Sequence, residues 1–213
     1  MQKHRAWTRL PSGAHLDLIN PSPMAWLDSD LSTRLARTAR WCGESTHAYS
    51  LSVAQHSLMV LALREQWSAK PLTPGEALNE LLHDAEEGFL GFDCVSTLKP
   101  VFGESFENVS DNLMNAIRAR YQLPIWTPET YRLHKLADVT CAASEAVHYV
   151  GWSRDEVKNV LGIDHPVLEL DPLTRFGEMA WTVWPPEYAD KAFHTKFMAL
   201  LLLHRQSTVE SVS

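Results

Sequence analysis

The stretch of sequence that decides the fold reads Thr73-Pro-Gly-Glu76-Ala-Leu-Asn-Glu-Leu-Leu-His83-Asp84-Ala-Glu-Glu87-Gly-Phe-Leu-Gly91. Proline directly after Thr73 suits the first position of a helix, where a backbone N–H has no partner to lose. Apolar residues then recur at helical spacing, at Ala77, Leu78, Leu81 and Leu82. The pattern predicts one helix that begins at Thr73-Pro74, carries the adjacent pair His83-Asp84 and ends between Gly88 and Gly91.

Two interpretations of His83-Asp84 are open. Consecutive helical side chains diverge by ~100°, so both reach one ion only if it lies over the edge between them, near a helix end. The other interpretation is a buried histidine oriented by its neighbour, and the dipeptide alone favours it because short motifs arise often by chance. Glu87 shares the same side of the helix and could orient a metal-bound water.

Two flanking helices strengthen the metal interpretation. The helix expected from Ser52 to about Ser68 has His56 on its buried stripe. On the helix expected from about Glu129 to Val150, ionisable residues share one face with Asp138, and apolar neighbours indicate that this aspartate is buried. A buried aspartate is costly unless it is paired or bound to metal. A divalent cation of hard to borderline character accepts this mixed set of nitrogen and oxygen donors, namely His56, His83, Asp84 and Asp138.

Further candidates rest on weaker patterns. His134 and His148 share the face of Asp138, and for them a solvated face is the preferred interpretation. Asp93 follows the helix end and is either an acid near the site or a simple turn residue. Arg34, Arg37 and Arg40 form a row that is typical of a solvated basic face. Arg40, followed by Trp41, could instead hold a phosphate under a stacked base, and Lys99 is a weaker phosphate candidate.

Length and composition restrict the class of protein. A chain of 213 residues with 45% hydrophobic and 21% charged residues is expected to form one globular domain spanning residues 1–213. No apolar stretch approaches the ~20 residues of a membrane span, and no signal peptide is expected. Three widely spaced cysteines suit reduced thiols in the cytoplasm. A net charge of −7 argues against a nucleic-acid polymer as partner, but not against a small anionic substrate.

The rest of the chain predicts an all-α fold with a short N-terminal arm. Residues 1–28 are expected to form an arm or loop, with one short strand near 15–19. Residues 29–150 contain the motif-bearing helices, which include a helix from Asp28 or Ser29 to about Arg40, a loop at 92–102 and a helix at 103–121. Residues 151–213 are expected to supply three helices, at 153–161, 172–184 and 186–205.

With these motifs in order, the chain resembles the HD-domain metal-dependent phosphohydrolases, and most closely the branch of bacterial 5′-deoxynucleotidases and their phage-encoded relatives. The matching text is Ser52-Val-Ala-Gln-His56-Ser, Leu81-Leu-His83-Asp84-Ala-Glu-Glu87-Gly-Phe-Leu-Gly and Lys135-Leu-Ala-Asp138. Further matches upstream are Leu16-Asp-Leu-Ile-Asn-Pro21 and Arg40-Trp41-Cys-Gly43. The resemblance covers roughly residues 13 to 149.

The resemblance implies a compact multi-helix HD-domain with one divalent metal ion, whether Mn, Co, Mg, Zn or Fe. It implies His56, His83, Asp84 and Asp138 as metal ligands, Glu87 as the water-positioning carboxylate, and Arg40-Trp41 as substrate contacts. Relatives have Leu-Gly-Asp where this chain has Leu90-Gly91-Phe92-Asp93, so Asp93 matches the second acidic residue only with one residue inserted.

The leading hypothesis is a phosphohydrolase acting on a small-molecule nucleotide, with Glu87 and Asp93 as catalytic residues. Within it, a 5′-deoxynucleotidase and a dNTP triphosphohydrolase are both open. The alternative is a non-catalytic helical protein that keeps the metal as a structural element or ligand sensor. The sequence leaves the oligomeric state open, including a homo-oligomer.

Overall fold

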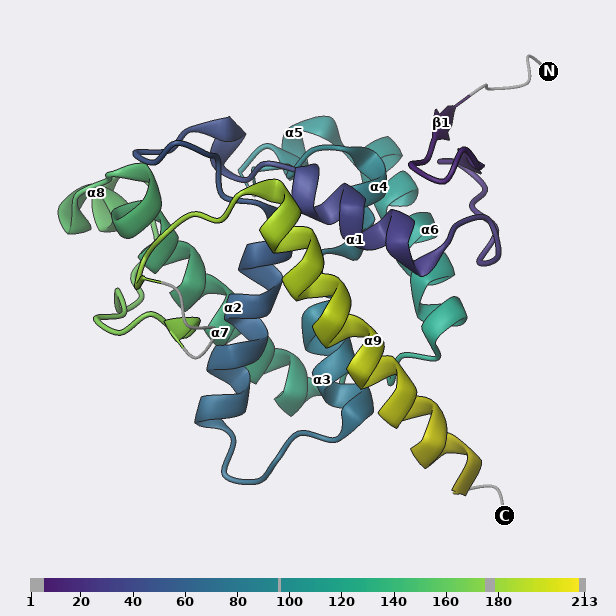
Figure 1. The fold of residues 1–213 in the computed structure, drawn as a ribbon. Coiled ribbons are helices and arrows are strands. Elements are labelled where there is room, and N and C mark those ends of the chain that lie inside the picture. Colours follow the sequence, from purple (N-terminus) through teal and green to yellow (C-terminus); the bar gives the residue numbers. More distant parts are fainter. Residues whose placement is uncertain (1–5, 96, 175–178, 211–213) are drawn as a thin grey trace.

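The computed structural model describes residues 6–95, 97–174 and 179–210. At its centre lies the helix α2 (Val53–Trp67), in which every residue from 53 to 64 is buried. A helix that is buried on all sides needs other helices around it. Four helices pack against α2 in this way (Figure 1), namely α1 (Asp28–Arg37), α3 (Pro74–Leu81), α7 (Pro128–Glu145) and α9 (Pro186–Glu210).

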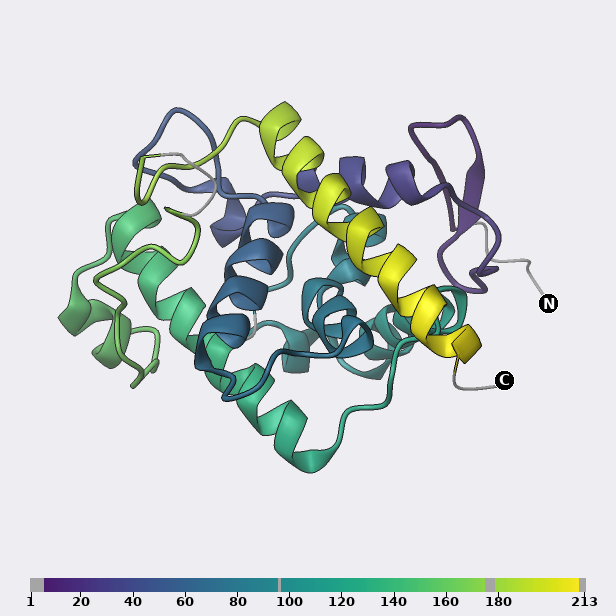
Figure 2. The ribbon, with the colours of Figure 1, turned by 60° about the horizontal axis from the view of Figure 1, so that its bottom comes forward.

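The C-terminal helix α9 holds this group of helices together. In two views it runs diagonally across α1 and α3, and it packs against both as well as against α2 (Figures 1 and 2). Phe193, Phe197 and Leu201 of α9 are buried in the main apolar core. The helix expected at 186–205 is therefore present, and it extends to Glu210.

The mostly helical architecture confirms the all-α expectation. Further helical segments are η1 (Trp41–Gly43), α4 (Ala85–Leu90), α5 (Lys99–Phe102), α6 (Glu104–Tyr121), the π-helical η2 (Ala146–Val150) and α8 (Arg154–Asn159). Hydroxyl side chains cap the starts of α2, α3, α7 and α8, where the first N–H groups lack helical partners. The short helix α5 lies in the stretch that the sequence predicts as loop.

The expected helix from Thr73 to Gly91 is divided in two, and this corrects the prediction. α3 ends at Leu81 and α4 begins at Ala85, so His83-Asp84 lies at the junction. The Nδ1 atom of His83 is 2.8 Å from the carbonyl oxygen of Glu80, the acceptor that a continuing helix would offer to the backbone N–H of Asp84. A side chain thus competes for the helical acceptor where the helix breaks.

Two other expected helices differ from the structure. The first helix ends at Arg37 rather than Arg40, because Thr38 is extended and Ala39 pairs with Ser52 in a β-bridge. Residues 172–174 and 179–184 form no α-helix in the described part of the expected 172–184 segment. The carboxylate of Asp171 instead accepts hydrogen bonds from the backbone N–H of Leu173 and of Trp181, at 2.8 and 2.7 Å.

The N-terminal arm contains a hairpin rather than a single strand. β1 (Trp7–Arg9) pairs antiparallel with β2 (His15–Asp17), with Thr8 opposite Leu16. Leu10 and Leu16 anchor this hairpin in the main core. No helix in the described residues is both long enough and apolar enough to cross a bilayer.

Candidate metal centre

Four predicted ligands converge from three parts of the fold: His56 from α2, His83 and Asp84 from the α3–α4 junction, and Asp138 from α7. The two Nε2 atoms of the histidines are 3.2 Å apart. Oδ2 of Asp84 lies 3.5 Å from Nε2 of His56 and 3.1 Å from that of His83. Oδ1 of Asp138 lies 3.4 and 4.0 Å from the same atoms. Ligands of one small divalent cation stand roughly 3–3.4 Å apart, so His56, His83 and Asp84 in particular fit one ion.

Hydrogen bonds on the far side of each ring identify the tautomer of both histidines. Nδ1 of His56 lies 2.5 Å from Oε1 of Glu145, and Nδ1 of His83 faces the carbonyl of Glu80. An ionised carboxylate and a carbonyl only accept hydrogen bonds, so each Nδ1 carries the proton. With Nδ1 protonated, the two Nε2 atoms face each other at 3.2 Å, and two lone pairs at that separation require a proton or a cation between them.

Glu145 is a site residue to which the sequence assigned no role. It is fully buried and accepts hydrogen bonds from Nδ1 of His56, from Nε of Arg40 and from Nε1 of Trp41, the last two at 3.0 Å. Burial opposes its ionisation, but Arg40 and His56 outweigh burial and lower the pKa of Glu145 to about 2. In the sequence, Glu145 lies four residues after Cys141, on the helix face that carries Asp138, and this position is the signal that could have identified it as a site residue.

Glu80 supports the second histidine and explains why His134 is not on a solvated face. His134 is buried, contrary to the prediction, and its Nδ1 lies 2.8 Å from Oε2 of Glu80. Nε of Arg64 donates to the other carboxylate oxygen at 2.7 Å. The His134 ring contacts that of His83 edge-on, at 4.7 Å between centroids. The buried Arg64–Glu80–His134 network thus packs directly behind a candidate ligand.

His148 also departs from the solvated-face interpretation, for a different reason. It lies in the π-helical turn that follows α7, and it is half-buried. Its ring stacks on Trp181 with centroids 3.9 Å apart, and its Nε2 faces the carbonyl oxygen of Leu168 at 2.9 Å. His148 therefore connects the end of α7 to Leu168 and Trp181, away from the metal ligands.

The two candidate carboxylate ligands are held ionised. Burial opposes this, but the neighbouring histidines lower the pKa of both Asp84 and Asp138. Lys135, one helical turn before Asp138, pairs with the oxygen Oδ2 of that aspartate. Burial and Arg40 oppose a charge on His56, whereas Glu145, Asp138 and Asp84 together raise its pKa. Negative charge thus predominates at the point where the Nε2 atoms meet.

Arg40 and Asp93 both lie at this cluster. Arg40 is buried after the end of α1, so it does not belong to an exposed helical row as the sequence suggested. Its Nη1 is 3.8 Å from Oδ2 of Asp84 and 3.4 Å from Oδ2 of Asp93. The loop after α4 therefore brings Asp93 to the site despite the inserted Phe92. Trp41 is half-buried beside Arg40, with its indole N–H committed to Glu145.

Glu87 and Lys99 lie beside Asp84. Glu87 is buried in α4, and its Oε2 has no hydrogen-bond partner among the described residues. Burial and then the charges of Asp84, Asp93 and Glu86 raise the pKa of Glu87. Nζ of Lys99, at the start of α5, lies 3.8 Å from Oε1 of Glu87. Glu87, Lys99, Arg40, Trp41 and Asp93 are thus all within reach of the cluster, directly or through one neighbour.

The donor chemistry fits a divalent cation. Carboxylates outnumber cationic side chains around the two Nε2 lone pairs even without Glu87, whose pKa is raised: Asp84, Asp93, Asp138 and Glu145 face Arg40, Lys99 and Lys135. A cation between the imidazoles would satisfy both lone pairs and offset this excess of negative charge. The group His56, His83 and Asp84 can therefore hold a metal ion.

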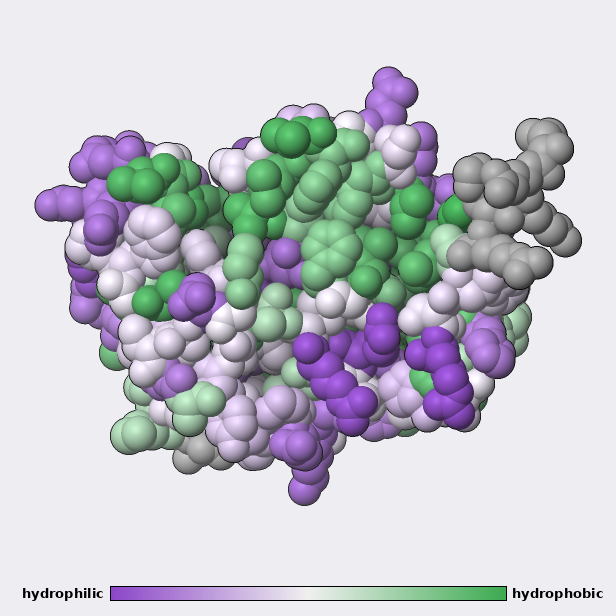
Figure 3. Space-filling model, turned by 90° about the horizontal axis from the view of Figure 1, so that it is seen from above, coloured by the Kyte–Doolittle hydropathy of each residue, from purple (hydrophilic) through white to green (hydrophobic). Residues whose placement is uncertain are grey.

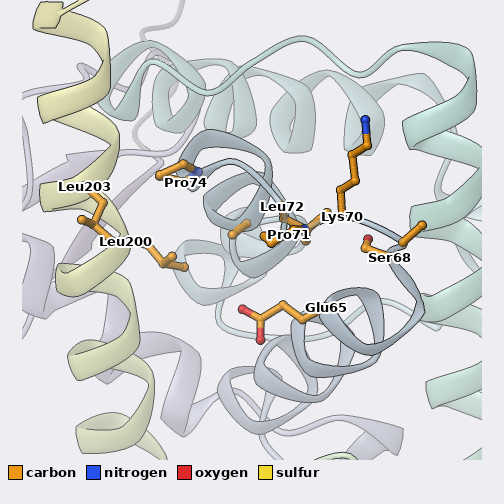
Figure 4. Close-up of a pocket in the computed structure, with 10 residues that line it drawn as sticks. Glu65, Ser68, Lys70, Pro71, Leu72, Pro74, Leu200 and Leu203 are labelled. Carbon is orange, nitrogen blue, oxygen red and sulfur yellow. The ribbon is translucent and has the colours of Figure 1, made fainter.

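A cavity of about 430 Å³ lies away from this cluster, between the end of α2, the start of α3 and α9 (Figure 4). Glu65 and Leu200 line it, together with Pro74 and Leu203. Glu65 is nine residues beyond His56, which places it ~13 Å further along the helix axis. Glu65 also pairs with Lys196 of α9 at 3.0 Å. This cavity carries none of the candidate site residues.

The comparisons with known proteins give one relative without an assigned activity. No family model matches the chain. The chain is 38% identical over 167 residues to an uncharacterized protein of Rhodobacter capsulatus, and the matched region takes in 77% of this chain and 83% of that protein. Identity of this level over most of both chains reflects common ancestry, and the chain therefore belongs to the same family as this uncharacterized Rhodobacter capsulatus protein.

Proposed function

We propose that this protein is a metal-dependent phosphohydrolase of the HD-domain type that acts on a small nucleotide. One observation carries the proposal: two imidazole Nε2 lone pairs and the carboxylates of Asp84 and Asp138 converge beside a buried glutamate with an unpartnered oxygen. A purely structural metal site would have no use for the carboxylate of Glu87 at its edge.

The ligands of the metal would be His56, His83, Asp84 and Asp138. A divalent cation bound there supplies Lewis-acid activation of water and of the phosphoryl oxygen. Glu145 and the carbonyl of Glu80 hold the two imidazoles in the tautomer that presents Nε2. Such supporting hydrogen bonds orient metal ligands and raise their basicity.

Glu87 is the residue that we assign to the attacking water. A bound cation would favour the ionised form of Glu87 against the charges that raise its pKa. Its Oε2, which has no partner among the described residues, could then accept a hydrogen bond from that water and afterwards its proton. Lys99 and Arg40 lie on the same side and can contact the phosphate oxygens. Asp93, beside Arg40, is placed to protonate the departing ester oxygen.

A nucleoside 5′-monophosphate is the substrate class that the local charges favour. A triphosphate needs several cations to balance its oxygens. Here Arg40 already pairs with three carboxylates, and Lys99 and Lys135 each pair with one. A single phosphate group together with one metal ion matches this limited positive charge better than a chain of three.

The test is a turnover screen of nucleoside mono- and triphosphates, with Mn²⁺, Co²⁺, Mg²⁺ and Zn²⁺ added separately to protein stripped of metal. We expect phosphate release from a monophosphate with at least one metal. Glu87→Gln should keep the metal and lose ~10²–10⁴-fold in kcat, because glutamine cannot accept the proton. Glu107→Gln, on the exposed face of α6, is the matched control and should retain full activity.

The same screen separates the alternatives. Release of triphosphate from a dNTP would move the protein to the triphosphohydrolase class. Stoichiometric metal binding without turnover of any nucleotide would favour the non-catalytic sensor or structural role. Normal turnover by Glu87→Gln would leave the base unassigned and contradict the role given to this residue.

A further inference from the structure

A second cavity, of about 320 Å³, lies between the N-terminal hairpin, α1 and the end of α4. Its lining contains three arginines and no carboxylate: Arg9, Leu10, Pro11, Arg34, Arg37, Thr38 and Gly91. The whole chain carries a net charge of −7, so a pocket with three guanidinium groups is a local exception to the overall charge. Opposite charge must come from solution or from a ligand.

The three arginines have no carboxylate partner in the part of the chain that the structure describes. Arg34 is fixed by backbone carbonyls, with Nε donating to Gly88 at 2.8 Å and Nη2 donating to Phe89 at 3.0 Å. Its burial and the charge of Arg37 lower the pKa of Arg34, and no acidic group offsets them. Arg37 follows one helical turn later and is exposed, as is Arg9 on β1.

The nearest candidate for a partner on α1 is committed elsewhere. Asp30 precedes Arg34 by four residues, a spacing at which opposite charges can pair. Its carboxylate instead accepts hydrogen bonds from the backbone N–H and the hydroxyl of Ser12 and from the backbone N–H of Leu27. The fold therefore uses Asp30 to hold the hairpin, and the three arginines line one cavity without a carboxylate partner among the described residues.

We propose that Arg9, Arg34 and Arg37 form an anion-binding site for a phosphoryl group, separate from the metal centre. Guanidinium groups bind phosphate oxygens through paired, charge-assisted hydrogen bonds. Arg34, held in place by α4, would provide a fixed contact, while Arg37 and Arg9 close on the ligand from α1 and β1. This site does not depend on the proposed hydrolase activity.

A neighbouring cavity extends the proposal to the rest of the ligand. Arg37 and Gly91 also line a mostly apolar cavity of about 430 Å³, which is bounded by Phe92, Leu98 and Phe102 and reaches Asp93 at the edge of the metal centre. These three side chains are partly exposed, and Figure 3 shows apolar side chains gathered on the face where α5 lies. A phosphate ester with an aromatic group, such as a nucleotide, would match both cavities, whereas inorganic phosphate would use the arginines alone.

The experiment is calorimetric titration of the metal-stripped full-length Asp84→Ala protein, so that the metal centre is disabled. The probes are inorganic phosphate, pyrophosphate and 5′-dAMP. We expect at least one to bind, and Arg37→Gln and Arg9→Gln each to weaken it about tenfold or more. Arg118→Gln, which removes an exposed helical arginine from α6, is the matched control and should leave binding unchanged.

The outcomes distinguish the source of the phosphoryl group. Tighter binding of 5′-dAMP than of phosphate, lost in Phe102→Ala, supports a nucleotide that spans both cavities. Equal binding of the two, unaffected by Phe102→Ala, supports free phosphate. Absence of binding for all probes, or equal weakening by Arg37→Gln and Arg118→Gln, would overturn the site. The absence of turnover in the nucleotide screen would not affect this result.

Discussion

At the scale of single residues, the candidate metal centre depends on which ring nitrogen of each histidine carries the proton. His56 and His83 both commit Nδ1 to an acceptor, Glu145 in one case and the carbonyl of Glu80 in the other. Their Nε2 atoms are therefore free to act as metal ligands. The carboxylates of Asp84 and Asp138 complete a set of donors that suits a divalent cation better than any single pair of these residues.

Asp84→Ala should abolish metal binding while the protein remains folded. The side chain of Asp84 makes no capping hydrogen bond at the start of α4, so the helix does not depend on it. Losing one carboxylate from two nitrogen and two oxygen donors should weaken divalent binding severely. Metal content and circular dichroism of the purified variant check this, with Asp111→Ala on α6 as control. Full metal occupancy in Asp84→Ala would remove Asp84 from the ligand set.

Glu145→Gln should affect both stability and metal affinity. Glutamine cannot balance the buried charge of Arg40, and breaking a buried ion pair typically costs about 3–5 kcal/mol. Glutamine has only one acceptor oxygen, whereas His56 uses Oε1 and Arg40 and Trp41 use Oε2 of Glu145; a lost or weaker hydrogen bond to His56 should lower metal affinity by about 10–100-fold. Urea unfolding and metal titration measure the two effects. Glu129→Gln, which breaks the exposed pair with Arg132, should change neither. Unaltered metal affinity would show that Glu145 does not orient His56.

At the scale of elements, the contact between α1 and α4 sets the position of Glu87. Gly88 follows Glu87 and lies against Leu35 of α1, so close that an added Cβ would stand 3.0 Å from two Leu35 side-chain atoms and 3.3 Å from its backbone nitrogen. Arg34 also donates to two carbonyls at this helix end. Close packing on one side and hydrogen bonds on the other thus define where α4 lies.

Gly88→Ala should therefore destabilise the protein by about 1–2 kcal/mol. Overpacking a core contact costs about 1–3 kcal/mol, and the better helix propensity of alanine offsets part of this. Gly75→Ala is the comparison, since its new Cβ would meet the ring of His204, a side chain that can move aside. Urea unfolding of both variants measures which substitution lowers the free energy of unfolding more. A cost for Gly75→Ala that equals or exceeds that for Gly88→Ala would contradict the packing argument.

At the scale of the whole molecule, the candidate ligands join parts of the chain that are distant in sequence. His56 comes from the central helix α2, His83-Asp84 from the α3–α4 junction, and Asp138 from α7. All of these elements pack around one core to which α9 also contributes. A cation bound there would link three helical segments, so metal binding and folding should be coupled.

Saturating metal should therefore raise the melting temperature. A ligand present at 100 times its Kd stabilises the folded state by about 2.7 kcal/mol. For a chain of this size that corresponds to a rise of roughly 5–11 °C. Thermal unfolding with and without Mn²⁺ or Zn²⁺, reversed by a chelator, measures it. The same rise in Asp84→Ala would place the responsible metal elsewhere in the molecule.

The sequence by itself determined the helical class and most of the helix positions. Apolar periodicity and capping residues act over a few neighbours, so the starts of α2, α3, α7 and α8 can be read locally. The same patterns, with the family resemblance, selected His56, His83, Asp84 and Asp138 as a set. The expected burial of Asp138 holds only in part, because α7 exposes Leu136 on one side and Asp138 itself is half-buried. Catalytic and substrate roles for Glu87, Arg40 and Lys99 remain predictions for the experiments above.

Only the tertiary structure decided which groups meet across the chain. The break at His83-Asp84, the burial of His134 by Glu80 and the burial of Arg40 against Glu145 all depend on partners that the local pattern does not name. The same holds for Arg9, Arg34 and Arg37, which line one cavity. Asp30 does not pair with them, because its carboxylate accepts hydrogen bonds from Ser12. Helical periodicity is a property of neighbouring residues. Charge pairing and hydrogen bonding depend instead on distances between segments that come together only when the helices pack.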